Sequence, residues 1–243
     1  MLRAKSSGWT TLRFSEKSNL HLLSKFLDYA NDGISLNTIV FRHPMHIYRS
    51  DASEFGLGGC NIVSGKAWRF ELPIDCHLRT SPNLLEFLAG VITIWTDFLS
   101  GNIDLESCIL SQTDCTSAAG WIRKSNFADV EDGIVQMTTS RHLASLAIKS
   151  KCCLYSQWFS GGDSVVSDAL SRDFRLSHTD LSSLISSSVP KQVPFGIQIQ
   201  TLPDEISSWV TCLLQNQPFK MQWSKEPMQS KLALGLASIP TSS

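Results

Sequence analysis

The chain has 243 residues, a formal net charge of −1 and a hydrophobic content of 42%. This apolar content, with 12 Phe and 7 Trp, excludes a wholly disordered chain and predicts one domain with extensions or two small domains. The near-neutral charge excludes a basic field over the whole molecule, so contact with nucleic acid would need a local patch. Composition therefore predicts a globular unit without indicating its partner.

The 7 cysteines are scattered along the chain, and two of them, Cys152 and Cys153, are adjacent. This pattern fits neither a paired zinc-binding motif nor the even count of a secreted disulfide framework, so we expect reduced thiols. The first residues lack the apolar segment of a secretory signal, and the longest apolar stretch, 84–99, is short for a membrane span and contains Glu86 and Asp97. We expect an intracellular, soluble protein without a membrane partner.

The predicted elements begin with a short amphipathic helix over residues 19–29 and become regular from residue 45. The expected strands cover residues 46–51, 57–63, 67–72, 108–113 and 154–159, and the expected helices after the first cover 82–99, 117–124, 139–151 and 164–172. Tight turns join the first three strands into an antiparallel meander. The order of strands and helices predicts an α/β fold with a mixed five-stranded sheet and helices on both faces.

Three regions differ in composition. Residues 1–44 form an N-terminal extension, residues 45–175 carry the regular elements, and residues 176–243 begin as a Ser- and Pro-rich linker. The last region also contains one short helix candidate, opened by Pro203-Asp204-Glu205 and followed by apolar residues at core spacing. We therefore expect one α/β domain between irregular N- and C-terminal extensions.

Glycines Gly56, Gly58 and Gly59 lie at and after the start of the second expected strand. Because they do not open a helix, they do not have the context of a dinucleotide-binding loop, and we expect no small-molecule cofactor. Glycine within a strand also lets another backbone approach closely. We expect the three glycines to serve that packing role.

Four carboxylates occupy comparable places in the predicted elements. Asp51 and Asp114 end the first and fourth strands, Glu86 lies early in the first long helix, and Asp168 lies in the last helix. In a mixed sheet the two strands would be parallel neighbours, so their carboxyl ends would meet. Acids brought together repel one another unless cations lie between them, and oxygen-only ligands favour Mg²⁺ or Mn²⁺. Paired ions of this kind suit in-line displacement at phosphorus.

Each acid also has a simpler interpretation. Asp51 could start a turn, Asp114 could cap the helix after it, and Glu86 could complement the dipole of its helix. Asp168 could face solvent. Only convergence of the acids in space would favour the metal site over these separate roles.

Four segments resemble the RNase H domain of retroelement reverse transcriptases, especially gypsy-like elements and those that carry a tyrosine recombinase. The matching segments are Asp51-Ala52-Ser53 with Gly56 and Gly58, Asn83 to Ala89, Thr113 to Ala118, and Gly161 to Arg172. The last segment is the most specific, because Val165-Val166-Ser167-Asp168-Ala169-Leu170-Ser171-Arg172 is similar to the closing signature of that family. The resemblance spans about residues 45–175.

The resemblance implies cleavage of the RNA strand of an RNA–DNA hybrid. Two Mg²⁺ or Mn²⁺ ions would be held by Asp51, Glu86, Asp114 and Asp168, and other segments of a retroelement polyprotein would be further partners. Candidate nucleic-acid contacts are Ser53, Thr116, Arg123, Lys124 and Arg141. The basic three could form a surface for phosphates with Trp121, or could be a charged helix face that only meets solvent.

The chain also departs from the family pattern. Trp158 stands where the family often has His, Ser164 stands where it often has Asn, and no His lies between His142 and Asp168. One alternative is therefore a degenerate copy that keeps the fold and binds nucleic acid or another polyprotein segment without cutting. A second is another enzyme of the same broad fold, such as a transposase or integrase. Those enzymes close their acidic set with a late Glu, whereas this chain presents Asp168.

Overall fold

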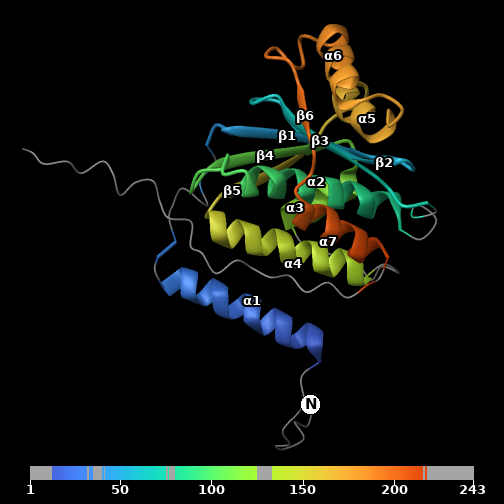
Figure 1. Cartoon of the computed structure of the whole chain (residues 1–243). Helices are drawn as coiled ribbons and strands as arrows, with labels where there is room; N and C mark the ends of the chain where they lie inside the picture. The colour runs from blue at the N-terminus through green and yellow to red at the C-terminus, as the bar shows by residue number, and fades with distance from the viewer. Residues whose placement is uncertain are drawn as a thin grey trace, which may run out of the picture.

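A mixed sheet forms the centre of the computed structural model, which describes residues 13–31, 33–34, 40, 42–74, 76, 80–124, 133–215 and 217 (Figure 1). The strands are β1 (His46–Ala52), β2 (Gly56–Asn61), β3 (Lys66–Glu71), β4 (Cys108–Thr113), β5 (Cys153–Trp158) and β6 (Gln198–Gln200). The helices are α1 (Phe14–Asn31), α2 (Pro82–Leu99), α3 (Thr116–Lys124), α4 (Gly133–Ser150), α5 (Val165–Arg172), α6 (His178–Ser188) and α7 (Asp204–Leu214).

The strand order is β5-β4-β1-β2-β3-β6. Strands β1, β2 and β3 form the expected antiparallel meander, and β4 and β5 run parallel to β1. Arg49 of β1 lies opposite Gln112 of β4, so Asp51 and Asp114, each two residues further on, lie at the carboxyl ends of neighbouring strands. The predicted parallel pairing of the first and fourth strands is confirmed.

The described residues form six strands in this sheet, where we expected five. The additional strand, β6, pairs in parallel with β3 and places Ile199 opposite Ala67. It comes from the region expected to be a linker, which also forms α6 and buries Leu181 and Ile185. Two apolar residues four apart on a Ser-rich helix give a weak periodic signal, and a three-residue strand is too short for alternation to be recognised.

One face of the sheet is covered by α2, which packs on β1 and β2. Every residue of α2 from Leu84 to Asp97 is buried, because α3 and α4 pack on its outer side. Helix α7 joins the same hydrophobic core, where Trp209 contacts the rings of Trp95 and His142 at centroid distances of 5.3 Å and 5.2 Å. The predicted tail helix is therefore part of the main core.

The opposite face is covered by α5 and α6, which enclose a second hydrophobic cluster with β2, β3 and β6 (Figure 1). Gly58 of β2 allows α5 to pass against the strand, because a Cβ there would lie 2.5 Å from Leu170 Cβ and 2.8 Å from Ser171 N. A Cβ at Gly59 would meet Thr93 Oγ1 at 2.1 Å on the other face. The packing role expected of these glycines is confirmed, and it brings α5 close to the end of β1.

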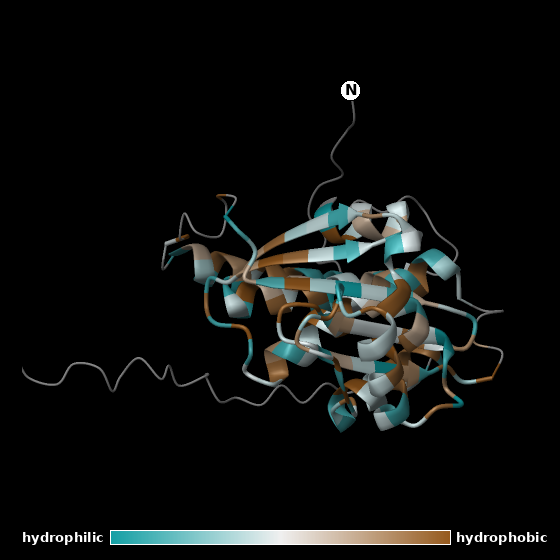
Figure 2. Ribbon diagram, turned by 90° about the horizontal axis from the view of Figure 1, so that it is seen from above, coloured by the Kyte–Doolittle hydropathy of each residue, from teal (hydrophilic) through white to brown (hydrophobic). Residues whose placement is uncertain are grey.

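Helix α1 begins at Phe14 and packs beyond α4, outside the layers next to the sheet (Figure 1). Brown hydrophobic and teal hydrophilic segments alternate along individual strands and helices in Figure 2, as expected for elements with one face in a core. None of the helices in the described part of the chain combines the length and apolarity needed to cross a bilayer.

The close approach of α5 to β2 predicts a different response at two glycines. Gly58→Ala should lower the free energy of unfolding by about 1–3 kcal/mol, because backbone atoms of α5 must move to admit the methyl group. Gly120→Ala in α3 should be neutral or stabilising by up to about 1 kcal/mol, since nothing lies within 4 Å of its added Cβ. Urea unfolding followed by circular dichroism measures both, and equal midpoints would contradict the close contact.

Candidate metal centre

Three of the predicted acids converge at the carboxyl ends of β1 and β4. Asp51, Glu86 and Asp114 each offer a carboxylate oxygen within 4.8 Å of the others. Asp51 is 5% exposed and Glu86 is 8% exposed, whereas Asp114 is half-buried. Two parallel strands deliver the aspartates, and the first turns of α2 deliver the glutamate. These three acids could together hold a metal ion.

Glu86 bridges the ends of the two strands. Its Oε1 accepts a hydrogen bond from the backbone N–H of Ala52 at 3.0 Å, and its Oε2 accepts one from Thr113 Oγ1 at 3.3 Å. Burial raises the pKa of Glu86 to about 9, and the charges of Asp51 and Asp114 act in the same direction. Two donors therefore fix the carboxylate in place but leave its negative charge poorly compensated.

Asp51 is held from the other face of the sheet. Ser171 Oγ of α5 donates to Asp51 Oδ2 at 2.5 Å. Burial raises the pKa of Asp51 to about 6, partly opposed by this hydrogen bond and reinforced by the charges of Asp114 and Asp168. Asp51 is thus a second buried acid whose ionisation is less favourable than that of an exposed aspartate.

Asp114 lies on the more open side of the cluster. Trp158 Nε1 at the end of β5 donates to the Asp114 carbonyl at 2.7 Å, which fixes the turn that follows β4. Gly161 lies against the carboxylate, because a Cβ built there would be 2.8 Å from Asp114 Oδ2. The Gly turn before α5 therefore provides the space that the Asp114 carboxylate occupies.

Asp168 lies beside the three-acid cluster and outside its 4.8 Å limit. Its side chain is half exposed, and its Oδ1 accepts from Arg172 Nε at 2.5 Å, one helical turn further along α5. Its charge nevertheless contributes to the raised pKa of Asp51. The structure brings together three of the four predicted acids and keeps the fourth nearby, paired with an arginine.

The chemistry of the three-acid cluster fits a hard divalent cation. All three donors are carboxylate oxygens, the ligand type that Mg²⁺ and Mn²⁺ prefer. Within the described residues, no Lys or Arg lies at ion-pair distance from these three carboxylates. A cation between them would replace mutual repulsion by attraction and would offset the effect of burial, which is the main cause of the raised pKa values of Asp51 and Glu86.

The predicted nucleic-acid contacts lie in different surroundings. Thr116 and Arg123 are exposed on α3, the helix that follows Asp114. Ser53 is buried: its hydroxyl donates to the carbonyl of Ser171 and accepts from two backbone N–H groups of the β1–β2 turn.

The other basic candidates and Trp121 do not form a described open surface. Arg141 donates to Asn19 Oδ1 at 2.9 Å and so joins α4 to α1. Trp121 packs edge-on against Phe87 at 5.8 Å. The side chain of Lys124 lies outside the described residues.

Three side chains that hold the acids were not identified from the sequence. Thr113 bonds to Glu86, Ser171 bonds to Asp51, and Trp158 bonds to the Asp114 carbonyl. Thr113 and Ser171 are within the segments that resemble RNase H motifs, and Trp158 stands where that family often has His. The position of Thr113 and Ser171 in these motifs could have drawn attention to them, although residue type alone did not reveal which group each one bonds to.

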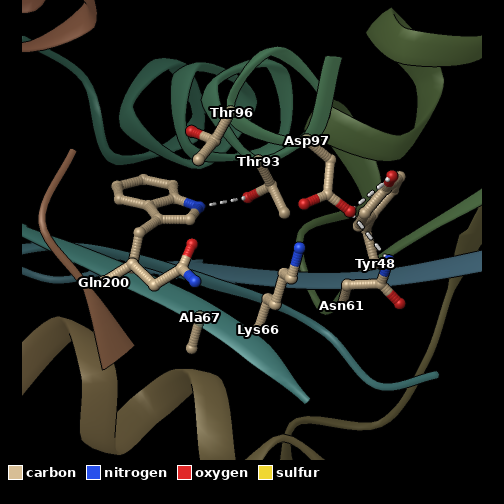
Figure 3. Close-up of a pocket in the computed structure, with 9 residues that line it drawn as sticks. Tyr48, Asn61, Lys66, Ala67, Thr93, Thr96, Asp97 and Gln200 are labelled. Carbon is tan, nitrogen blue, oxygen red and sulfur yellow. Dashed lines mark hydrogen bonds between the residues drawn. The ribbon is translucent and has the colours of Figure 1, made fainter. Parts of the chain in front are cut away.

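A third buried acid, Asp97, lies near the other end of α2 in a different environment (Figure 3). Tyr48 Oη and Asn61 Nδ2 donate to its Oδ2 at 3.0 Å and 2.8 Å, and Asn102 Nδ2 donates to its Oδ1 at 3.1 Å. Lys66 Nζ in turn donates to Asn102 Oδ1 at 2.7 Å. The adjoining cavity of about 10 Å³ has room for one water at most. Neutral donors thus satisfy Asp97, as in a structural network.

The contact between Gly161 and Asp114 predicts a selective effect on metal binding. Gly161→Ala should weaken Mg²⁺ affinity about tenfold, the lower end for changes that displace a ligand indirectly, because the methyl group pushes on Asp114 Oδ2. Gly162→Ala should leave affinity unchanged, since its Cβ would have Ser160 Oγ as nearest neighbour at 3.8 Å. Titration calorimetry compares them; equal affinities would refute the steric role of Gly161.

The raised pKa values predict how stability depends on pH. Glu86 and Asp51 have ordinary pKa values of 4.5 and 3.8 and higher pKa values when folded, so the folded state binds more protons. Their contribution to stability is fully present below about pH 4 and is lost as pH rises through 6 toward 9. In chelator, Glu86→Gln should therefore melt at a higher temperature than wild type at pH 8, with a smaller difference at pH 5. Each kcal/mol gained in the free energy of unfolding corresponds to a shift of about 2–4 °C.

The same melting experiment is repeated with Mg²⁺, and Asp97→Asn serves as the control at another buried acid. Mg²⁺ should raise the melting temperature of wild type at pH 8 and should leave Glu86→Gln unchanged. Asp97→Asn should lower the melting temperature at both pH values by a similar amount, because an amide cannot accept from all its neutral donors. A metal-free Glu86→Gln chain less stable than wild type at pH 8 would contradict the charge argument.

No family model matches this chain. No curated protein matches it either. Its function must therefore be inferred from the acids, their geometry and the motif resemblance.

Proposed function

We propose that this chain is a metal-dependent ribonuclease of RNase H type that cleaves the RNA strand of RNA–DNA hybrids. The observation that carries the proposal is the convergence of Asp51, Glu86 and Asp114, two of them buried, at the ends of two parallel strands. The mixed sheet with helices on both faces is consistent with an RNase H-like fold. The motif resemblance suggests RNA–DNA hybrid as the substrate and retroelement replication as the biological context.

In this proposal each acid has a defined task. Asp51, Glu86 and Asp114 would hold one cation, and Asp168, which pairs with Arg172 on α5, would supply a ligand to a second. Bound cations supply activation of water and neutralisation of charge at the scissile phosphate. The half-buried Asp114 side faces the substrate, since the other two acids are enclosed by protein.

The surface beside Asp114 supports binding of a nucleic-acid backbone. Thr116 offers a hydroxyl and Arg123 a guanidinium from the exposed side of α3. Contacts to phosphate fix the position of a strand without reading its sequence. Recognition of the RNA strand then depends on its 2′-hydroxyls and the A-form shape of the hybrid, so sequence preference is weak.

One observation favours a second candidate, a module that binds nucleic acid or another polyprotein segment without cutting. Asp168 is paired with Arg172 and lies outside the close set, so the chain presents three clustered acids where the resemblance implies four ligands. A chain that holds one cation and lacks the second would bind a hybrid without the charge neutralisation needed for efficient cleavage. Cleavage and binding must therefore be measured together.

The proposal predicts Mg²⁺-dependent loss of the RNA strand from an end-labelled RNA–DNA hybrid, with no cleavage of duplex DNA of the same sequence. Asp114→Asn should lower the rate by more than about 100-fold, since disturbing a ligand only indirectly already costs 10–100-fold. Asp204→Asn, which neutralises an exposed acid in the first turn of α7, should cleave like wild type.

Gel-shift binding of the same hybrid separates the two candidates. Binding without cleavage in wild type and in Asp114→Asn would support the non-catalytic module and refute the nuclease. Equal cleavage of hybrid and duplex DNA would refute recognition of the RNA strand.

A further inference from the structure

Helix α5 carries a buried hydroxyl that contacts the metal centre. Ser171 is 0% exposed, and its Oγ donates to Asp51 Oδ2 at 2.5 Å. The same Oγ lies 3.0 Å from the carbonyl of Asp168, one turn earlier in the helix. A hydroxyl has one proton, and the shorter bond to a carboxylate is the stronger of the two. The proton of Ser171 is therefore directed at Asp51.

The backbone of Ser171 is held by the same strand end. Ser53 Oγ donates to the carbonyl of Ser171 at 2.7 Å and accepts from the N–H groups of Phe55 and Gly56 at 3.0 Å and 3.2 Å. Residues 51 and 53 of the chain thus contact one residue of α5, the first through its side chain and the second through its carbonyl. This two-point contact fixes both the carboxylate and the turn that follows it.

The position of α5 allows little freedom in this contact. A Cβ at Gly58 would lie 2.8 Å from Ser171 N, so the helix backbone rests directly on β2. Ser171 is consequently held at a fixed height above the sheet while its hydroxyl reaches β1. By contrast, the Asp51 side chain alone has two rotatable bonds that could turn its carboxylate away from Glu86 and Asp114.

We propose that Ser171 is a positioning residue of the metal centre: its hydroxyl fixes the Asp51 carboxylate in the orientation that places an oxygen within 4.8 Å of those of Glu86 and Asp114. This inference rests on metal binding by the three acids and extends it to α5. Partners that orient metal ligands act through affinity, because a ligand that must be ordered on binding binds the ion less tightly.

The same helix offers a matched control. Ser167 is also 0% exposed on α5, but its hydroxyl pairs with Ser164 Oγ and has no contact with the acids. Removing either hydroxyl leaves a cavity of similar size in the same helix. A purely structural role for Ser171 would therefore affect both variants alike, whereas a positioning role affects metal affinity in Ser171→Ala alone.

The test is Mn²⁺ affinity, measured by electron paramagnetic resonance on wild type, Ser171→Ala and Ser167→Ala, with urea unfolding of each in chelator. Ser171→Ala should bind Mn²⁺ about tenfold more weakly than wild type, while Ser167→Ala stays within twofold. Unfolding midpoints in chelator give the loss of stability of each variant separately from its loss of Mn²⁺ affinity. Ser171→Cys, which keeps the side-chain volume with a weaker donor, should give intermediate affinity and replaces Ser171→Ala if that variant does not fold.

The outcomes separate this inference from the proposed function. Unchanged Mn²⁺ affinity in Ser171→Ala, or an equal loss in Ser167→Ala, overturns the positioning role and leaves the metal centre intact. A wild-type chain that binds no Mn²⁺ overturns both. A wild-type chain that binds Mn²⁺ with the expected loss in Ser171→Ala, yet does not cleave a hybrid, supports the positioning role and refutes the nuclease.

Discussion

The burial of neighbouring carboxylates is the constraint on which the candidate site depends. Three acids within 4.8 Å, two of them almost without solvent, carry charge that a low-dielectric surrounding penalises. Asp97 shows that the fold can satisfy a buried acid with neutral donors, since three side chains bond to it. At the strand ends, by contrast, three acids lie together, and burial raises the pKa values of Glu86 and Asp51. Such incomplete compensation is typical of functional sites.

The glycines of β2 are the structural condition for that cluster. Because Gly58 has no side chain, α5 rests on the strand and Ser171 reaches Asp51. Gly59 serves the opposite face in the same way, admitting Thr93 of α2. Both helices that contribute to the site, α2 with Glu86 and α5 with Ser171, therefore approach the sheet through glycines of one strand. Sheet packing and site geometry are determined by the same residues.

The sequence predicted the part of the fold in which each element has a strong local pattern. The meander, the parallel pairing of β1 with β4 and the long apolar α2 were all recognisable, and the acids stood out because each lies at the end or start of such an element. β6 and α6 were missed, since a three-residue strand and a Ser-rich helix owe their structure to the surfaces they cover.

The candidate site was predictable in its acids and not in the groups that hold them. Thr113 and Ser171 are ordinary residue types, and a hydroxyl shows its role only when its partner is known. Ser53 also shows that residue type and position do not reveal the partner of a hydroxyl. It was expected to contact nucleic acid, whereas its hydroxyl bonds within the turn and to α5. Chain proximity to an acid does not reveal the direction of a side chain.

The position of the Asp168 carboxylate outside the three-acid cluster is also explained by charge. Its helix is held against β2 at Gly58, and its side chain pairs with Arg172. A fourth carboxylate in the cluster would add repulsion; the charge of Asp168 still raises the pKa of Asp51, and the charge of Arg172 opposes it. A half-exposed pair of this kind is worth only about 0–1 kcal/mol, so a cation that attracts Asp168 needs little free energy to displace the arginine. Pairing with Arg172 is therefore compatible with a ligand role for Asp168 and with its place outside the metal-free cluster.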